Sequence, residues 1–300
     1  MPLHGWLILD KPVGLGSTQA VGAVKRLLRQ GGYPKARVGH GGTLDPLASG
    51  VLPIAIGEAT KLSGRMLDAD KAYDFTIQFG IETDTLDAEG KAVAESAVRP
   101  TRAAIEAVLP LFTGPIDQLP PAFSALKVGG KRAYDLARAG EEVALATRQV
   151  TIHALTLGES RADALGEATF SARVSKGTYI RSLARDIAHA LGTVGHVIML
   201  RRTKAGPFAL EQAISLDILE EAARAARLQE LLLPLTAGLD DIPVLAVSPD
   251  QAVALRQGRR LTGTAATPGL SLAMLGGTPV ALVEAGDDVK VVRGFNLMSE

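Results

Sequence analysis

The feature that most constrains the fold is a strict two-residue alternation within residues 71–80. Tyr73, Phe75, Ile77 and Phe79 occupy every second position of this segment. Successive side chains of a β-strand point to opposite faces of a sheet, so this spacing predicts a strand with one apolar face. Such a strand requires neighbouring strands and a core packed against that face.

Other apolar runs, bounded by glycine, proline and capping residues, predict the remaining elements. The expected strands cover residues 5–12, 51–56, 148–157, 166–175 and 196–202, and the expected helices cover residues 17–30, 58–66, 100–112, 133–139, 178–191 and 215–226. Ser17 or Thr18 is the expected cap of the first helix. The acidic stretch 82–98 and the basic stretch 120–132 are expected to be loops. The sequence therefore predicts a mixed α+β protein.

A domain boundary is expected near residue 243. Beyond it the sequence predicts one helix at 248–257 and short strands within 259–297, which supply too little apolar mass for a large domain. We therefore expect residues 1–243 to form the main domain and residues 244–300 a small β-rich one.

A single carboxylate lies in a loop of glycine, proline and small apolar residues that spans residues 39–53. Asp45 is the only acidic residue between Asp10 and Glu58. The glycines at 39, 41 and 42 permit backbone angles that other residues avoid, and Pro46 biases Asp45 toward an extended or turn conformation. We interpret the loop as one that orients a single acid; an aspartate that merely caps the turn is the alternative.

Composition excludes several kinds of chemistry. The chain has no cysteine, which rules out disulfides, thiolate nucleophiles and cysteine-bound metal clusters. Its five histidines show no metal-ligand spacing, so no metal site is predicted. Neither a signal peptide nor a membrane-spanning run is evident. We expect a soluble cytoplasmic protein without membrane contact, and the absence of heptads favours a monomer.

The net charge is zero, but the charges are unevenly distributed. Residues 1–65 hold eight Lys or Arg against three Asp or Glu, and residues 173–206 hold seven against one. Residues 66–119 reverse the balance, with four against ten. The two basic segments predict a face that binds a polyanion such as RNA. Ordinary solvated helix surfaces are the alternative.

Three further segments carry candidate functional side chains. They are Tyr73 on the alternating strand, the turn Lys176–Arg181, and the run Leu200–Thr203. An arginine that pairs with Asp45 and two tyrosines with stacking faces suit a pocket for a planar base extruded from RNA. Taken singly, each of these residues also fits ordinary packing or solvent exposure.

In this order the segments resemble the TruB-type tRNA pseudouridine synthases. The similarity extends over residues 5–208, and the motifs that carry it are Leu9-Asp10-Lys11-Pro12-x-Gly14, the Asp45 loop, Gly57–Lys61, Lys71-x-Tyr73, Pro120–Lys127, Gly177–Arg181 and Leu200–Thr203. The usual family loop is closer to Gly-His-Thr-Gly-Ala-Leu-Asp. Gly41 and Thr43 depart from it, whereas His40 and Asp45 stay in register.

The resemblance implies that the chain isomerises one uridine in the T-loop of tRNA, at position 55, to pseudouridine without cofactor or metal. The N1–C1′ bond breaks and C5 rejoins C1′. Asp45 would act on the ribose or on the uracil ring, and Arg181 would pair with it. Tyr73 would stack on the flipped base and take the C5 proton. The resemblance assigns substrate binding to His40, Gly42, Tyr179, Leu200, Lys61, Lys127, Arg132 and Arg202, with the loop 127–132 becoming ordered on RNA.

The resemblance also implies a mixed, mainly antiparallel sheet flanked by helices and a PUA-like RNA-binding domain at 244–300. Arg256, Arg259 and Arg260 are the only basic cluster of that segment, and a purely structural appendage is the alternative. The expected partner is the T-arm of tRNA, with no obligate protein partner. The competing function is a protein that binds and remodels tRNA independently of catalysis, for which Asp45 is dispensable.

Overall fold

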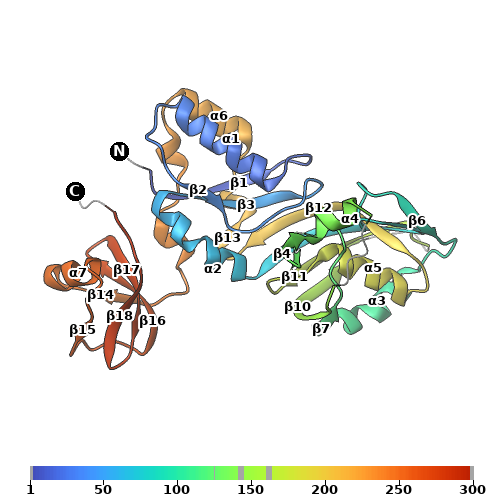
Figure 1. Ribbon diagram of the computed structural model, residues 1–300. Coiled ribbons are helices and arrows are strands. Elements are labelled where there is room, and N and C mark those ends of the chain that lie inside the picture. The colour runs from blue at the N-terminus through green and yellow to red at the C-terminus, as the bar shows by residue number, and fades with distance from the viewer. Residues whose placement is uncertain (1–2, 125, 141–144, 160–163, 298–300) are drawn as a thin grey trace.

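The structure is built around a large sheet formed by residues 5–209 (Figure 1). The computed structural model describes residues 3–297, apart from residue 125 and residues 141–144 and 160–163. Within that part of the chain the large sheet has nine strands: β1 (Gly5–Lys11), β2 (Val38–His40), β3 (Ser49–Ile56), β4 (Lys71–Phe79), β7 (Gly114–Gln118), β10 (Arg148–Leu157), β11 (Glu167–Val174), β12 (Gly195–Ala205) and β13 (Phe208–Ala209).

The strands follow the order β1-β3-β12-β4-β11-β10-β7, with β2 paired to β3 and β13 paired to β12. Along this path only β3 and β12 run parallel, and every other neighbouring pair is antiparallel. The prediction of a mixed, mainly antiparallel α+β fold is confirmed.

The central strand β4 explains where the core lies. Phe75, Ile77 and Phe79 are at most 1% exposed, as their alternation predicts. They share one core with the apolar side chains of helix α5 (Ile180–Ala190), which packs on β4 and β12. Tyr73 continues the same face but is only half-buried. The apolar face of β4 therefore leaves the core at Tyr73.

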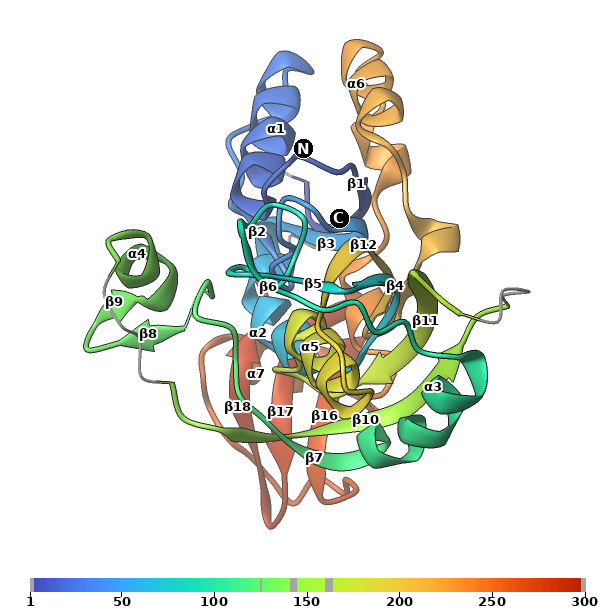
Figure 2. The same ribbon diagram turned by 90° about the vertical axis from the view of Figure 1, so that its right-hand side faces the viewer.

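Two helices pack together on the β1–β3 edge of the sheet (Figures 1 and 2). Helix α1 (Ser17–Gln30) buries Ala20, Val24 and Leu27 at three- and four-residue intervals, the spacing of an amphipathic helix. It contacts helix α6 (Leu216–Arg224). This packing fixes the end of β1 and the start of α1, between which the chain approaches the Asp45 loop.

A second sheet follows residue 243 and appears as a separate layer in Figure 1. Its described strands are β14 (Val244–Ala246), β15 (Leu261–Thr262), β16 (Gly269–Leu275), β17 (Thr278–Ala285) and β18 (Asp288–Gly294), in the order β14-β16-β17-β18-β15. Helix α7 (Pro249–Arg256) covers it and shares its apolar core. A cluster that includes Trp6, Phe208, Leu272 and Phe295 joins this sheet to the larger one.

Several local predictions were wrong. The expected helix 58–66 is a 3-10 helix (Gly57–Leu62) followed by α2 (Ser63–Asp68), and the expected helix 100–112 is α3 (Arg102–Val108) followed by a 3-10 helix (Leu109–Phe112). The expected loop 82–98 contains the hairpin β5 (Ile81–Thr83) and β6 (Ala92–Glu95). All four residues of β6 are exposed, so no apolar alternation marked it. Strands β2 and β7 were also missed.

The basic stretch 120–132 includes a second small hairpin, β8 (Lys127–Val128) and β9 (Lys131–Arg132), which leads into α4 (Ala133–Arg138). Figure 2 shows this unit projecting from the body of the molecule. Further 3-10 helices cover Leu210–Gln212, Leu228–Leu231 and Leu235–Gly238. None of the helices in the described ranges is long and apolar enough to cross a membrane.

Candidate active site

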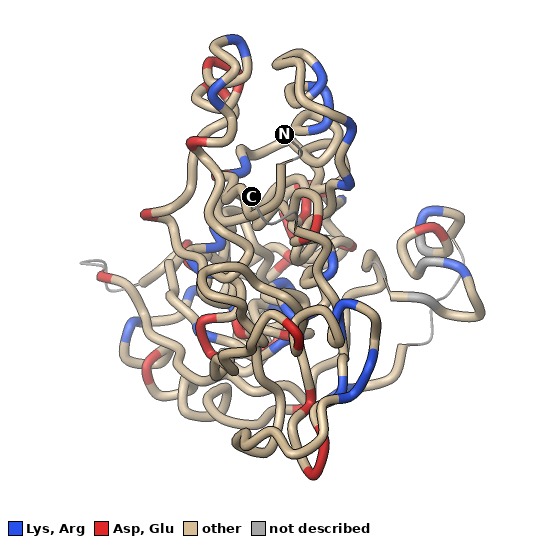
Figure 3. The backbone as a smooth tube through the Cα atoms, turned by 90° about the vertical axis from the view of Figure 1, so that its left-hand side faces the viewer, with Lys and Arg blue, Asp and Glu red and all other residues tan. Residues whose placement is uncertain are grey.

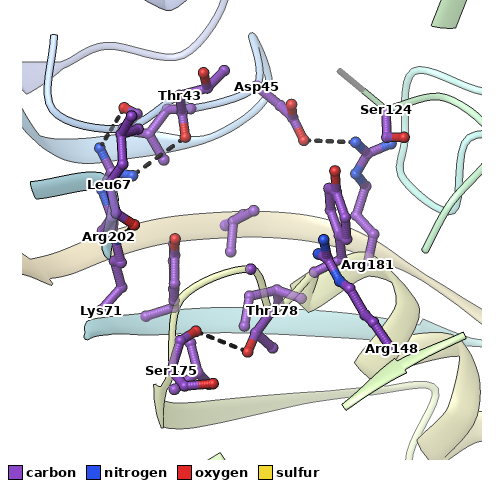
Figure 4. A pocket seen from close by; sticks show the side chains of 18 residues that line it. Thr43, Asp45, Leu67, Lys71, Ser124, Arg148, Ser175, Thr178, Arg181 and Arg202 are labelled. Atoms are coloured by element: carbon purple, nitrogen blue, oxygen red, sulfur yellow. Dashed lines mark hydrogen bonds and ion pairs between the residues drawn. The ribbon is translucent and has the colours of Figure 1, made fainter. Parts of the chain in front are cut away.

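A cavity of about 300 Å³ lies between the Asp45 loop, the ends of β4, β11 and β12, and the start of α5 (Figure 4). Seven of the residues that the sequence singled out line it: Gly42, Asp45, Tyr73, Tyr179, Arg181, Leu200 and Arg202. They come from four separate segments of the chain. The fold thus brings together most of the predicted site residues.

The floor of the cavity belongs to the sheet. Across the β4–β12 ladder Tyr73 pairs with Arg202, and Phe75 pairs with Leu200. Directly paired residues share one face of a sheet, so Tyr73, Leu200 and Arg202 all lie on the face that becomes the cavity floor. The alternation that placed Phe75 in the core also places Tyr73 at the cavity.

The Arg202 side chain donates hydrogen bonds to backbone carbonyls of the Asp45 loop and of the neighbouring strand β3. Its Nη2 and Nη1 donate to the carbonyl oxygens of Gly42 and Thr43 at 3.2 and 3.3 Å (Figure 4), and its Nε donates to the Val51 carbonyl at 2.7 Å. Its side chain is buried. Gly50 passes so close that a Cβ there would lie 2.2 Å from the Arg202 carbonyl oxygen. Arg202 therefore holds the loop in place.

The start of α1 clamps the residue before Asp45. The hydroxyl of Ser17 accepts from the Leu44 backbone N–H at 2.7 Å and donates to the Leu44 carbonyl at 2.9 Å. The prediction that Ser17 or Thr18 caps α1 was wrong, since Gly16 is the N-cap and its N–H is bonded by Gln19. The Ser17 hydroxyl is used across space, which local sequence cannot reveal.

Lys11 holds the turn at residues 12–15, whose Gly14 N–H donates to the Pro46 carbonyl of the Asp45 loop at 2.8 Å. Its buried Nζ donates to the carbonyls of Leu15, Pro12 and Pro46 at 2.6, 2.9 and 3.4 Å. Burial lowers the pKa of Lys11 to about 8, an effect partly opposed by the nearby Asp45 carboxylate. The Lys11 motif was noted in the sequence, but nothing there showed that its ammonium binds the carbonyls of its own turn and, at 3.4 Å, that of Pro46 in the Asp45 loop.

Arg181 orients Asp45. Its Nη2 lies 2.8 Å from Asp45 Oδ2 (Figure 4), and its Nη1 lies 3.3 Å from Asp87 Oδ2. The same guanidinium donates to the carbonyls of Thr85 and Phe123. Arg181 and Asp87 are buried, whereas the Asp45 side chain remains 38% exposed. The carboxylate is thus fixed on one oxygen and open to a ligand.

Asp87 was missed by the sequence analysis because it lies in the acidic stretch that was taken for a loop. It is buried behind Arg181, and its Oδ1 accepts from Thr85 and from the Glu89 backbone N–H. Asp87 pairs with Nη1 of Arg181, which Asp45 does not bind, and this second ion pair fixes the plane of the guanidinium.

The wall formed by Tyr179 is fixed by two residues that the sequence analysis also missed. The side-chain amide of Gln118 accepts from the Tyr179 N–H at 2.8 Å and donates to the Tyr179 carbonyl at 3.1 Å. The Arg148 guanidinium lies over the Tyr179 ring, with its Cζ 4.6 Å from the ring centroid. Gln118 and Arg148 face each other in the β7–β10 ladder. No spacing in the sequence links them to Tyr179.

Lys71 fixes the rim of the cavity. Its Nζ donates to the carbonyls of Met66, Leu67 and Ala69, at 2.6–2.9 Å, at the end of α2. Burial, assisted by the charge of Arg202, lowers the pKa of Lys71 to about 8. Leu67, which this lysine holds in place, is half-exposed and lines the cavity.

Two predicted substrate-binding residues, His40 and Lys61, do not line the cavity in the described part of the chain. His40 ends β2, and its Nδ1 accepts weakly from the Gly42 N–H at 3.4 Å; burial and Arg202 lower its pKa. Lys61 binds Glu58 at 2.6 Å and the carbonyl of Gly294 in the second sheet at 2.9 Å. The side chains of Lys127 and Arg132 lie outside the described part of the structure.

The basic segment 173–206 uses much of its charge internally. Arg181 and Arg202 are buried. Salt bridges of 2.8–2.9 Å join Lys176 to Asp68, Arg185 to Asp186 and Arg201 to Asp10. By contrast, Figure 3 shows only basic charges on α1, beside the mixed charges of α6. Within the described residues, the exposed basic side chains of the two segments without an ion-pair partner lie on α1 and at four positions outside it: Lys25, Arg26 and Arg29 on the helix, and Lys35, Arg37, Arg173 and Lys204 elsewhere.

The comparisons with known proteins agree with this geometry. Residues 25–180 match the family model described as the N-terminal domain of the TruB family pseudouridylate synthases, and residues 181–240 match that of the tRNA pseudouridylate synthase B C-terminal domain. The chain is 66% identical to the tRNA pseudouridine synthase B of Novosphingobium aromaticivorans over 98% of both chains. It is 63% identical to that of Zymomonas mobilis, over 98% of this chain and 96% of the relative.

Among solved structures, the archaeal box H/ACA Nop10–Cbf5 complex contains a chain of the same fold. Its TM-score is 0.71 at 25% identity, and the match covers 97% of this chain and 85% of the other. The chain therefore belongs to the TruB family of pseudouridylate synthases.

Proposed function

We propose that this chain converts uridine 55, in the T-loop of tRNA, to pseudouridine. The observation that carries the proposal is the Asp45 carboxylate, held at 2.8 Å by a buried arginine and exposed to a cavity lined by Tyr73 and Tyr179. The printed names of the relatives, tRNA pseudouridine synthase B, supply the substrate class. A cavity of about 300 Å³ is at the lower end of the range for small-molecule pockets, as a single flipped nucleotide requires.

The proposed reaction is an isomerisation in which atoms balance within the substrate. The N1–C1′ bond breaks, the uracil turns, C5 bonds to C1′, and the proton on C5 is removed while N1 gains one. An anionic Asp45 serves either proposed first step, attack on carbon or removal of a proton from the sugar. We assign base stacking and removal of the C5 proton to Tyr73, which lies on the cavity floor.

We further propose a domain boundary near residue 243 and an RNA-binding role for residues 244–300. Support comes from the separate sheet with its own core, and from the exposure of Arg256, Arg259 and Arg260. Replacing these three arginines by glutamine should weaken tRNA binding; unchanged affinity would make the sheet a structural appendage. We propose action in the cytoplasm, as a monomer, without an obligate protein partner.

The primary experiment incubates the purified protein with an unmodified tRNA transcript and maps pseudouridine by chemical labelling and primer extension. We expect one stop in the T-loop with the wild type and none with Asp45→Asn. The affinity of Asp45→Asn for tRNA should stay within about tenfold, because phosphate contacts dominate binding. Asp217→Asn, the same change at an exposed position of α6, is the matched control and should retain the stop.

Substantial turnover by Asp45→Asn would refute the assigned role of this carboxylate. Tight tRNA binding without a stop for any variant would favour the remodelling function instead. A stop outside the T-loop would support pseudouridine formation but refute the assignment to position 55.

A further inference from the structure

The charges that line the cavity are strongly unbalanced. Four cations, Lys71, Arg148, Arg181 and Arg202, face one carboxylate, Asp45. In Figure 4, Lys71 and Arg202 lie on one side of the cavity, and Arg148 and Arg181 lie on the other. Such a site suits a ligand that carries negative charge.

Three of the four cations are already satisfied by the protein. Arg181 is bonded by two carboxylates and two carbonyls. Arg202 donates to three carbonyls, and Lys71 donates to three others. A further anion would have to displace these bonds, so none of the three is a ready binding group for substrate.

Arg148 differs from the other three. Within the described residues its guanidinium has no hydrogen-bond or ion-pair partner, although its Nε is buried. The group is nevertheless held in place, because it lies over the Tyr179 ring at 4.6 Å. It also lies beside Gly177, where a Cβ would be 3.5 Å from its Cζ. A planar cation fixed by stacking, with its donors unused, is pre-organised for an anion.

We propose that Arg148 binds a phosphate of the substrate RNA, one of the two that flank the isomerised uridine. The inference rests on the proposed function, which brings a nucleotide into this cavity. A guanidinium pairs with phosphate through two parallel N–H bonds. The N-terminus of α5, which begins at Ile180 on the cavity wall, adds a favourable dipole. The Ser124 hydroxyl, also on this wall, is buried and without a partner among the described residues, and it supplies a second donor.

The test measures binding of T-arm hairpins to protein that carries Asp45→Asn, so that no turnover occurs. Three hairpins are compared: one unmodified, and two with a neutral methylphosphonate in place of either flanking phosphate. In this background Arg148→Gln should weaken binding of the unmodified hairpin about tenfold. It should also reduce the slope of log affinity against log salt by about 0.7, the value for one contact to a single strand.

The decisive result is whether the effects of Arg148→Gln and of a methylphosphonate on affinity are additive. One of the two methylphosphonates should weaken binding to the Arg148 protein about tenfold and leave binding to Arg148→Gln unchanged. Arg148→Lys, which keeps the charge without the planar fork, should restore part of the affinity. Arg224→Gln, the same change at an exposed position of α6, is the matched control and should leave the affinity and the salt slope as they are.

Two outcomes would overturn the inference. Additive losses from Arg148→Gln and from both methylphosphonates would show that Arg148 binds neither phosphate. Unchanged affinity and salt slope, with a lower kcat when Arg148→Gln is placed in otherwise wild-type protein, would show that Arg148 only supports the Tyr179 ring. Failure of the proposed function is distinguishable, because the protein with Asp45 and Arg148 intact would then form no pseudouridine in the same hairpin.

Discussion

The two walls of the cavity use their basic side chains in different ways. On the loop wall, defined here as residues 42–45, Arg202 donates only to backbone carbonyls, those of Gly42 and Thr43 in the wall and of Val51 on β3. On the helix wall, defined as residues 175–181 with Arg148, Arg181 donates to two carboxylates as well as to carbonyls, and Arg148 has no polar partner in the described structure.

This difference separates positioning from chemistry. A cation that binds carbonyls fixes the path of a loop and is itself satisfied. A cation that binds an exposed carboxylate orients that reactive group. A cation without a polar partner has donors free to bind a ligand. The comparison teaches that burial of a basic residue near this site does not by itself indicate contact with substrate.

The comparison predicts contrasting effects of Arg181→Met and Arg202→Met. Arg181→Met leaves the buried Asp87 carboxylate uncompensated, so we expect the free energy of unfolding to fall by about 3–5 kcal/mol. Turnover should fall about a thousandfold because Asp45 is no longer oriented. Arg202→Met removes donors from neutral carbonyls, at a cost of about 2 kcal/mol, and turnover should fall about tenfold. Urea unfolding and single-turnover assays measure both quantities.

Equal losses of turnover in the two variants, at matched folded fractions, would break the distinction between the walls. Arg181→Lys is the internal control. It keeps the charge beside Asp87 but cannot bridge both carboxylates with a planar fork, so stability should largely recover while turnover does not.

The fold was largely readable from the sequence where one physical signal dominated. The alternation at Tyr73, Phe75, Ile77 and Phe79 marked β4, and its last apolar members form the core as expected. Exposed strands such as β6 and short ones such as β2 carried no such signal. Their pairing depends on neighbours distant in sequence, which local patterns do not encode.

The site was readable only in part, for a related reason. Asp45 lies in a distinctive loop and Arg181 in a distinctive motif at the start of a helix, and the resemblance to a family paired them; the structure places them 2.8 Å apart. Arg148, Asp87 and Gln118 have no distinctive setting in the sequence. Their roles arise from contacts between β7, β10, the 81–95 hairpin and α5, which only the assembled fold creates.

Tyr73 lies on the floor between the two walls, and its hydroxyl tests whether a second group besides Asp45 takes part in the chemistry. We expect Tyr73→Phe to retain stacking and RNA affinity but to reduce turnover at least about a hundredfold, because the group proposed to take the C5 proton is lost. Single-turnover assays with saturating protein isolate this step from binding. Wild-type turnover in Tyr73→Phe would restrict Tyr73 to stacking.

Lys71 offers the smallest and most specific test of the carbonyl-bound cations. Burial lowers its pKa in the folded protein from 10.5 to about 8, so between these pH values the unfolded chain binds more protons at this residue. The contribution of Lys71 to the free energy of unfolding should therefore rise with pH in this window, by at most about 1.4 kcal/mol per unit. Lys71→Met lacks this contribution, whereas Lys11 titrates in both proteins and cancels in the comparison.

Urea unfolding at pH 8, 9 and 10 should show the stability of the wild type increasing relative to Lys71→Met. A constant difference across the three pH values would mean that Lys71 keeps its charge as readily in the folded protein as in the unfolded chain, because its three carbonyl bonds then fully offset the cost of burial.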